Sequence, residues 1–200
     1  MRRIIAFDRI SADGYFSAPD GNLNWAVPED ALDKEATSNI GGGGQGTLLF
    51  GRKTYQMFES FWPHALEDPG GAENPHRPGQ RSPEMRAMAE YINEAIKIVF
   101  SRTLKDVKWK NSRLFKKFLP GEVEALKREK GADIMIFGSG SIVAQLAQHD
   151  LVDEYQFIVN PVILGNGRSL ISGVSKSTGL KLEEAKPYKS GNVKLRYTRQ

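Results

Sequence analysis

The chain has 200 residues, of which 40% are hydrophobic, 26% charged and 10% aromatic, a composition typical of a folded domain with a sizeable core and not of a disordered protein. Lysine and arginine number 28 against 24 aspartate and glutamate residues. Because the net charge of +4 is small and both signs are spread along the chain, we expect no nucleic-acid partner. The absence of cysteine excludes disulfides, thiolate metal sites and a cysteine nucleophile, and it fits a reducing, cytoplasmic location.

Short apolar runs that stop at glycine or serine alternate with amphipathic segments as far as residue 150. They predict strands at 4–7, 47–50, 96–100 and 134–137, and helices at 29–39, 55–61, 121–130, from Pro83 onward and directly after Ser141. Such alternation predicts a largely parallel sheet with helices on both faces. Later strand patterns at 155–159, 180–185 and 193–197 add antiparallel members at one edge. The expected fold class is a single three-layer α/β domain over residues 1–200.

Two stretches lack a clear helix or strand pattern. Residues 66–82 are rich in proline and glycine and almost without apolar side chains, which predicts a long surface loop beside a site. Residues 105–117 are basic and predict a solvated face. No apolar stretch reaches the length of a membrane span or of the core of a secretory signal, so we expect no membrane partner.

The ends of three predicted strands carry small, hydroxylic or cationic residues. These are Gly51-Arg52-Lys53-Thr54, Ser101-Arg102-Thr103 and Gly138-Ser139-Gly140-Ser141. Ligands of open parallel sheets bind at the carboxyl ends of strands, where the chain turns into a helix with free N–H groups. The three segments together predict a dinucleotide site, with pyrophosphate on the helix starts and an additional ribose phosphate on arginine. None matches a Rossmann or Walker motif, so an interpretation as plain turns and helix caps stays open.

Eight short segments extend this pattern through the whole chain. They are SADGYF at 11–16, NW at 24–25, LFGRKTY at 49–55, FWP at 61–63, SRTL at 101–104, FGSGS at 137–141, LVDE at 151–154 and NPVILGNG at 160–167. In this order they resemble the dihydrofolate-reductase-like family. The resemblance is closest to the reductase domain of the bifunctional deaminase-reductase of riboflavin biosynthesis.

The resemblance implies an NADPH-dependent reductase with a pterin-like, folate-like or ribosylaminopyrimidine-like substrate. It implies that the cofactor phosphates are held by Gly51, Arg52, Lys53 and Thr54, the 2′-phosphate by Ser101, Arg102 and Thr103, and the pyrophosphate by Gly138, Ser139, Gly140, Ser141 and Ile142. Asp13, Gly14 and Trp25 are implied on the nicotinamide and substrate side, although Asp13 could equally order its own turn. Tyr55 and Phe58 are candidates for stacking on a flat heterocycle, with a place in the core as the alternative. An NADP(H)-binding module without turnover is the alternative.

Three of the glycine-loop residues carry specific expectations. Glycine at 138 and 140 is expected because a Cβ atom there would intrude on the pyrophosphate. Ser139 departs from dihydrofolate reductase, which has two glycines at the positions of Gly138 and Ser139. This departure matters if the backbone at Ser139 needs a positive φ.

Asp30 is the candidate catalytic acid, because it follows Trp25 by five positions and Pro28 by two, as the acid does in dihydrofolate reductase. A hydride delivered to a C=N or C=O carbon leaves charge on the heteroatom, so a nearby proton source lowers the barrier. The alternative is that Asp30 only begins a helix, where an acid suits the helix dipole.

A homodimer is expected through the late edge strands, because Tyr155, Phe157, Val159, Val162, Ile163 and Leu164 supply more apolar length than an exposed edge usually keeps. The three histidines, His64, His76 and His149, have no ligand spacing, so no metal site is expected.

Overall fold

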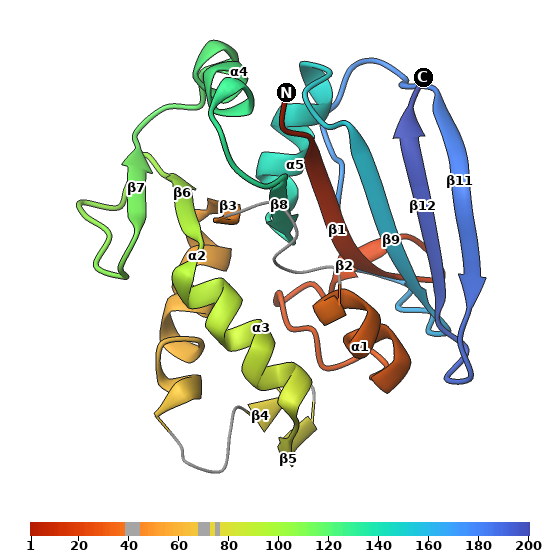
Figure 1. The fold of residues 1–200 in the computed structure, drawn as a ribbon. Coiled ribbons are helices and arrows are strands. Elements are labelled where there is room, and N and C mark those ends of the chain that lie inside the picture. Colours follow the sequence, from red (N-terminus) through yellow and green to blue (C-terminus); the bar gives the residue numbers. More distant parts are fainter. Residues whose placement is uncertain (39–44, 68–72, 75–76) are drawn as a thin grey trace.

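An eight-stranded sheet in the order β11-β12-β9-β1-β8-β3-β6-β7 forms the middle layer of the computed structural model, which describes residues 1–38, 45–67, 73–74 and 77–200 (Figure 1). The strands are β1 (Ile4–Ser11), β3 (Thr47–Gly51), β6 (Ile96–Phe100), β7 (Ser112–Phe115), β8 (Ile134–Phe137), β9 (Glu154–Asn160), β11 (Leu180–Pro187) and β12 (Val193–Arg199). All neighbours from β7 to β9 pair in parallel, and β12 is antiparallel to β9 and β11. The prediction of a mostly parallel sheet is confirmed.

Two smaller sheets accompany the main one. They pair β2 (Tyr15–Ser17) with β10 (Arg168–Ser169), and β4 (Glu73–Asn74) with β5 (Arg77–Arg81). The helices are α1 (Asp30–Ser38), α2 (Arg52–Phe61), α3 (Pro83–Glu94), α4 (Pro120–Arg128) and α5 (Gly140–Gln148), with one 3₁₀ turn, η1 (His64–Leu66).

Helices cover both faces of the sheet, and each face has its own hydrophobic core. Val123 of α4 and Val143 of α5 pack on one face with Ile4, Ala6 and Ile136 of the strands. The opposite face carries the buried side chains of α2 and α3, namely Tyr55, Met85, Ala89 and Ile92, packed on Leu48, Phe50 and Val99. Because strand side chains alternate between faces, this division follows from the strand sequences. The three-layer architecture expected from the sequence is confirmed.

Helix starts follow local signals. Ser82 caps α3 by accepting a hydrogen bond from the N–H of Met85 at 3.2 Å, and Pro83 occupies the first turn. The helix predicted at 55–61 begins earlier, at Arg52, because Gly51 ends β3 and serves as the N-cap. Residue 39, the predicted end of the first helix, lies outside the described residues, and α1 is described to Ser38.

Residues 155–159 are not at an edge of the sheet. They belong to β9, which lies between β1 and β12 and runs parallel to β1, so Tyr155 and Ile158 are buried. The argument for a dimer through an apolar edge is therefore wrong in its premise. The edge strand on this side of the sheet is β11, whose lysines, glutamates and terminal proline are typical of an edge that resists further pairing.

Two other expectations can be compared with the structure. The basic stretch contains β7, which adds to the sheet beside β6, and its lysines and Arg113 are exposed, so the expected solvated face is confirmed. Part of the predicted loop 66–82 is the antiparallel pair of β4 and β5, while 68–72 and 75–76 lie outside the described residues. Across the described ranges, no helix is long and apolar enough to cross a membrane, and no cluster of three or more histidine or acidic side chains has the geometry of a metal site.

Candidate functional site

The pairing of the sheet is interrupted at the carboxyl end of β8. β1 pairs with β8 only as far as Phe7 and Phe137, although β1 continues along β9 to Ser11. On the other side, β3 extends along β6 to Gly51 after its last pair with β8. We call this interruption the strand gap; it is bounded by residues 8–11 of β1, by Gly51 and by the turn after Phe137. Ligands of open parallel sheets bind at such positions.

The turn after β8 is left-handed at two successive residues, with φ of +64° at Gly138 and +61° at Ser139. For serine this conformation costs about 1–2 kcal/mol. Ser139 is the N-cap residue of α5 but makes no side-chain bond to its own helix. Instead, its Oγ accepts a hydrogen bond from the N–H of Gly51 at 3.1 Å. This bond offsets part of the strain and ties the turn to the end of β3, so serine is tolerated here despite a positive φ.

The starts of α2 and α5 lie side by side, and neither has a side-chain cap. A Cβ atom on Gly51 would stand 3.3 Å from Ile142 and 3.6 Å from the hydroxyl of Ser141, and one on Gly138 would stand 3.9 Å from Thr54. The structure thus brings together two of the three segments singled out in the sequence. First-turn N–H groups without intrahelical partners, with the positive ends of the helix dipoles, favour an anion.

The third segment follows β6, the neighbour of β3. The hydroxyl of Ser101 accepts hydrogen bonds from the N–H groups of Thr103 at 3.3 Å and Leu104 at 3.0 Å, so it organises the turn. The side chains of Arg102, Arg52 and Lys53 are exposed, and none of them forms an ion pair with the acidic side chains that the structure describes. These cations remain available to a ligand.

Gly140 is required by packing within the chain. A Cβ atom at Gly140 would stand 2.9 Å from the carbonyl oxygen of Leu170 and 3.0 Å from the ring of Phe16. Packing alone is therefore enough to require glycine here, and close approach of a pyrophosphate stays a prediction. Gly138 differs, because a Cβ atom there would make only an ordinary contact with Thr54 at 3.9 Å, so its need for glycine lies in the positive φ.

Among the residues expected on the substrate side, Tyr55 instead lies in the core. It is 1% exposed in the core, its hydroxyl donates to Glu59 at 2.9 Å, and it accepts the N–H of Trp109 at 3.3 Å. Phe58 does lie near the strand gap, because its ring stacks on that of Phe137 with centroids 6.3 Å apart.

Asp13 and Gly14 shape the turn between β1 and β2. The Asp13 carboxylate accepts hydrogen bonds from the hydroxyl of Ser11 at 2.6 Å and from the N–H groups of Leu164 and Gly165 at 3.1 and 2.7 Å. The bond from Ser11 is the main reason why the pKa of Asp13 is lowered. Gly14 has φ of +90°. Asp13 therefore orders two loops.

Trp25 is held by polar contacts two residues further along the chain. The N–H of Val27 donates to Oδ1 of Asn160 at 2.8 Å, and its carbonyl accepts from Arg9 at 3.2 Å and Asn192 at 2.9 Å. These contacts place residues 25–27, which we call the Trp25 segment, at the carboxyl ends of β1 and β9, beside α1 (Figure 1). Nε1 of Trp25 is buried with no hydrogen-bond partner among the described residues. Asp30 is exposed at the start of α1.

Sequence reasoning missed two charged residues of β1. Asp8 is 2% exposed, and burial raises its pKa well above the usual range, offset slightly by the backbone N–H of Gly138. That N–H does not reach hydrogen-bond geometry, and both carboxyl oxygens are without a partner in the described part of the chain. Burial lowers the pKa of Arg9, which faces Asp33 at 3.6 Å. Charge at 8 and 9 suggested the end of a strand, whereas β1 continues to Ser11.

The short β8, the left-handed turn after it and the paired helix starts define a doubly wound α/β domain of the dihydrofolate-reductase-like class. The chain belongs to the RibD C-terminal domain family, whose model matches residues 2–194. YyaP of Bacillus subtilis (strain 168), an uncharacterized protein, is 26% identical over 199 residues, which is 98% of this chain and 95% of YyaP.

Solved structures of the same fold agree with this assignment. A putative riboflavin biosynthesis protein from Shewanella sp. PV-4 has a TM-score of 0.68 and 20% identity, with 100% of this chain and 99% of that chain covered. Dihydrofolate reductase from Enterococcus faecalis, complexed with NADP(H) and RAB-propyl, has a TM-score of 0.60 and 14% identity, with 99% and 96% covered. The family and fold expected from the sequence are confirmed.

Proposed function

We propose that this chain is an NADPH-dependent reductase of a small heterocycle, either pterin- or folate-like or similar to 5-amino-6-(5-phosphoribosylamino)uracil. The observation that carries the proposal is the meeting of two uncapped helix starts, those of α2 and α5, at the carboxyl ends of neighbouring strands. An anion such as pyrophosphate fits their N–H groups. The Enterococcus reductase of the same fold was solved with NADP(H), which favours a nicotinamide dinucleotide as this anion.

The chain offers distinct groups for each phosphate. Backbone N–H groups at the starts of α2 and α5 would hold the pyrophosphate, with the hydroxyls of Thr54 and Ser141 nearby. The exposed guanidinium of Arg102, at the end of β6, would pair with a 2′-phosphate. When bound, the nicotinamide supplies a hydride.

The substrate would lie against the Trp25 segment. The orphaned indole N–H of Trp25 is a donor for a ring nitrogen or carbonyl, and the stacked Phe58 and Phe137 rings offer a flat apolar surface. The proton that balances the hydride would come from solvent at this end of the sheet; Asp30, exposed at the start of α1, is the one side-chain acid tested against it below.

Cofactor choice tests the proposal. We expect the wild-type protein to bind NADPH at least about tenfold more tightly than NADH, and Arg102→Ala to lose about tenfold to a hundredfold in NADPH affinity while NADH affinity stays unchanged, because only the 2′-phosphate contact is removed. Dissociation constants from fluorescence titration measure both effects. Lys108→Ala, which removes another exposed cation of the same loop, is the control and should change neither constant. Equal affinities for the two cofactors in the wild type would contradict the proposal.

Turnover is tested separately by screening NADPH oxidation over pterins, folates and pyrimidine ribosides. Oxidation that depends on one of these acceptors supports a reductase. Stoichiometric NADPH binding without oxidation by any acceptor would favour the alternative, an NADP(H)-binding module.

A further inference from the structure

Asp8 is a buried acid without a partner at the edge of the strand gap. It is the first residue of β1 beyond the last β1–β8 pair, Phe7 with Phe137. Its side chain is 2% exposed, and neither oxygen has a hydrogen-bond partner among the residues described. Buried polar groups are nearly always paired, because an unpaired one costs about 1–3 kcal/mol. An orphaned carboxyl at this point suggests a partner that the chain does not itself supply.

The surroundings of Asp8 are apolar apart from one backbone group. By strand alternation, its side chain lies on the same face as Ile4 and Ala6, the face covered by α5, while Arg9 and its partner Asp33 lie on the other face. The residue paired with it on β9 is Phe157. Burial raises the pKa of Asp8 and the N–H of Gly138 lowers it in part; no charged side chain in the described ranges contributes.

These surroundings favour the neutral carboxyl group. Burial opposes ionisation, and the one nearby N–H does not reach hydrogen-bond geometry, so a carboxylate here would be neither solvated nor paired. An ionised Asp8 acting as a cap for α5 would need bonds to the first N–H groups of that helix, and it makes none. A neutral carboxyl presents one donor and one acceptor on adjacent atoms.

The order of strands indicates which part of a dinucleotide would meet this group. The free cation Arg102 follows β6, the uncapped helix starts follow β3 and β8, and Asp8 lies on β1, the next strand in the sheet. A dinucleotide laid across this edge with its 2′-phosphate at β6 and its pyrophosphate at the helix starts has its nicotinamide at β1. The primary carboxamide of nicotinamide has an N–H donor beside a carbonyl acceptor, which complements a neutral carboxyl.

We propose that Asp8 is a positioning residue that pairs through two hydrogen bonds with the carboxamide of a nicotinamide bound in the strand gap. This proposal rests on the proposed function. It adds a residue of this chain that holds the ring, whereas the groups described above hold the phosphates.

The test compares NADPH with 2′-phospho-ADP-ribose, which has the same phosphates but no nicotinamide, by isothermal titration calorimetry. We expect Asp8→Leu to weaken NADPH binding about tenfold to a hundredfold and to leave 2′-phospho-ADP-ribose within about twofold. Asp8→Asn, which keeps a donor and an acceptor, should restore NADPH affinity. Equal weakening of both ligands, or of neither, would overturn the proposal.

The pH dependence supplies a readout that a purely structural role would not change. As the pH is raised, wild-type affinity for NADPH should fall where Asp8 ionises, because a carboxylate cannot donate to the carboxamide oxygen. Affinity for 2′-phospho-ADP-ribose, and NADPH affinity in Asp8→Asn, should not show this fall. A wild-type NADPH profile that matches that of Asp8→Asn would count against the pairing.

Where Asp8→Leu fails to fold, the wild type still decides. Reduced 3-acetylpyridine adenine dinucleotide phosphate has a methyl group in place of the amide nitrogen, so it should bind at least about tenfold more weakly than NADPH. Equal binding would overturn the proposal. A wild-type protein that binds neither NADPH nor 2′-phospho-ADP-ribose would refute the proposed function itself, whereas normal binding of both with no effect at Asp8 would refute only the role of Asp8.

Discussion

Ser139 combines a strained backbone with a compensating side-chain bond, and two substitutions separate these effects. Ser139→Ala keeps the positive φ and loses the bond to Gly51, so we expect the free energy of unfolding to fall by about 1–3 kcal/mol. Ser139→Gly loses the same bond but relieves the strain, and should be about 1 kcal/mol more stable than the alanine variant. Urea unfolding of the three proteins measures both differences. Equal stability of the two variants would show that the left-handed conformation carries no strain.

Residue chemistry was predictable where the sequence carried a local signal, and not where tertiary contacts decide. The hydroxylic and glycine-rich strand ends indicated the meeting of Gly51 with Ser139 and Ser141. In contrast, burial of Asp8 depends on the β-pairing of its neighbours and on α5, none of which is encoded near residue 8. Val27 is held by Asn160 and Asn192, which lie 133 and 165 residues further along the chain.

At the scale of elements, continuous apolar runs predicted strands correctly, and a strand of mixed sequence was missed. Apolar runs predicted β3, β6 and β8 within one residue, because these strands are buried on both faces. The edge strand β7 was missed, since among the described strands it pairs with β6 alone and its sequence is mixed. Whether β9 pairs in parallel with β1 or at an antiparallel edge depends on the path of the whole chain.

Substitution of Asp30, at the start of α1, tests whether this acid or solvent supplies the proton. Because Asp30 is exposed, we expect Asp30→Asn to lower the reduction rate of the accepted substrate less than about threefold and stability by about 0.3–1 kcal/mol, through the lost interaction with the helix dipole. Stopped-flow reduction and urea unfolding measure the two effects, and NADPH affinity is the control. A loss near a hundredfold in rate at unchanged NADPH affinity would instead identify Asp30 as the general acid.

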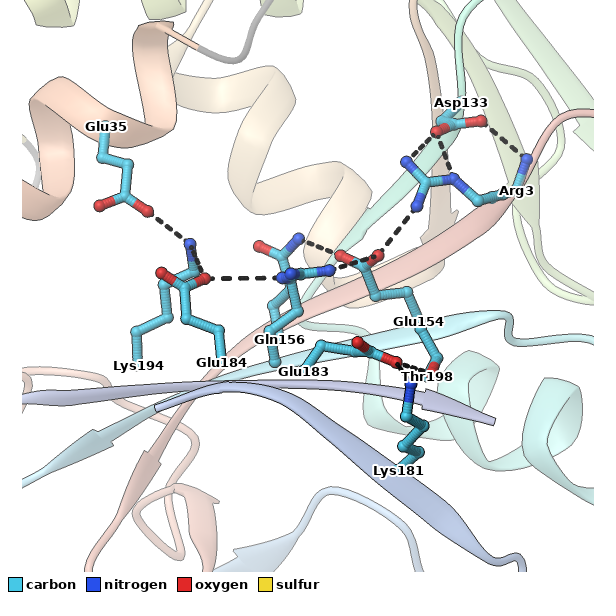
Figure 2. A network of polar contacts seen from close by, with 11 residues as sticks. Arg3, Glu35, Asp133, Glu154, Gln156, Lys181, Glu183, Glu184, Lys194 and Thr198 are labelled. Carbon is cyan, nitrogen blue, oxygen red and sulfur yellow. Dashed lines mark hydrogen bonds and ion pairs between the residues drawn. The ribbon is translucent and has the colours of Figure 1, made fainter. Parts of the chain in front are cut away.

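At the scale of the whole molecule, the character of the edge strand β11 bears on whether the sheet can extend into a second copy. β11 is charged and ends at Pro187, so extension of the sheet into a second copy at this edge is disfavoured. A homodimer stays a prediction, without the support of an apolar edge strand. The charged face of β9, β12 and β11 instead carries a network within the chain (Figure 2).

This network joins α1 to the C-terminal strands through Glu35, whose carboxylate accepts hydrogen bonds from Lys194, from Lys186 at 2.5 Å and from the Tyr188 hydroxyl at 2.9 Å. Burial alone would raise the pKa of Glu35, but these bonds outweigh it and lower the pKa from 4.5 to about 2. A group whose pKa is lower in the folded state stabilises the protein above its unfolded value, and this contribution is lost as the pH falls from 4.5 toward 2.

Glu35→Gln should therefore lower the free energy of unfolding at pH 7 by about 1–3 kcal/mol, and the two proteins should converge in stability as the pH approaches 2 to 3. Urea unfolding at several pH values measures this. Glu90→Gln removes an exposed helix pair with Arg86 and should cost less than about 0.5 kcal/mol, which makes it the matched control. The bonds of Glu35 hold α1, the helix that follows the Trp25 segment. We therefore also expect Glu35→Gln to weaken substrate binding more than NADPH binding. A stability difference that is the same at pH 7 and pH 3 would show that the ion pairs of Glu35 do not stabilise this end of the fold.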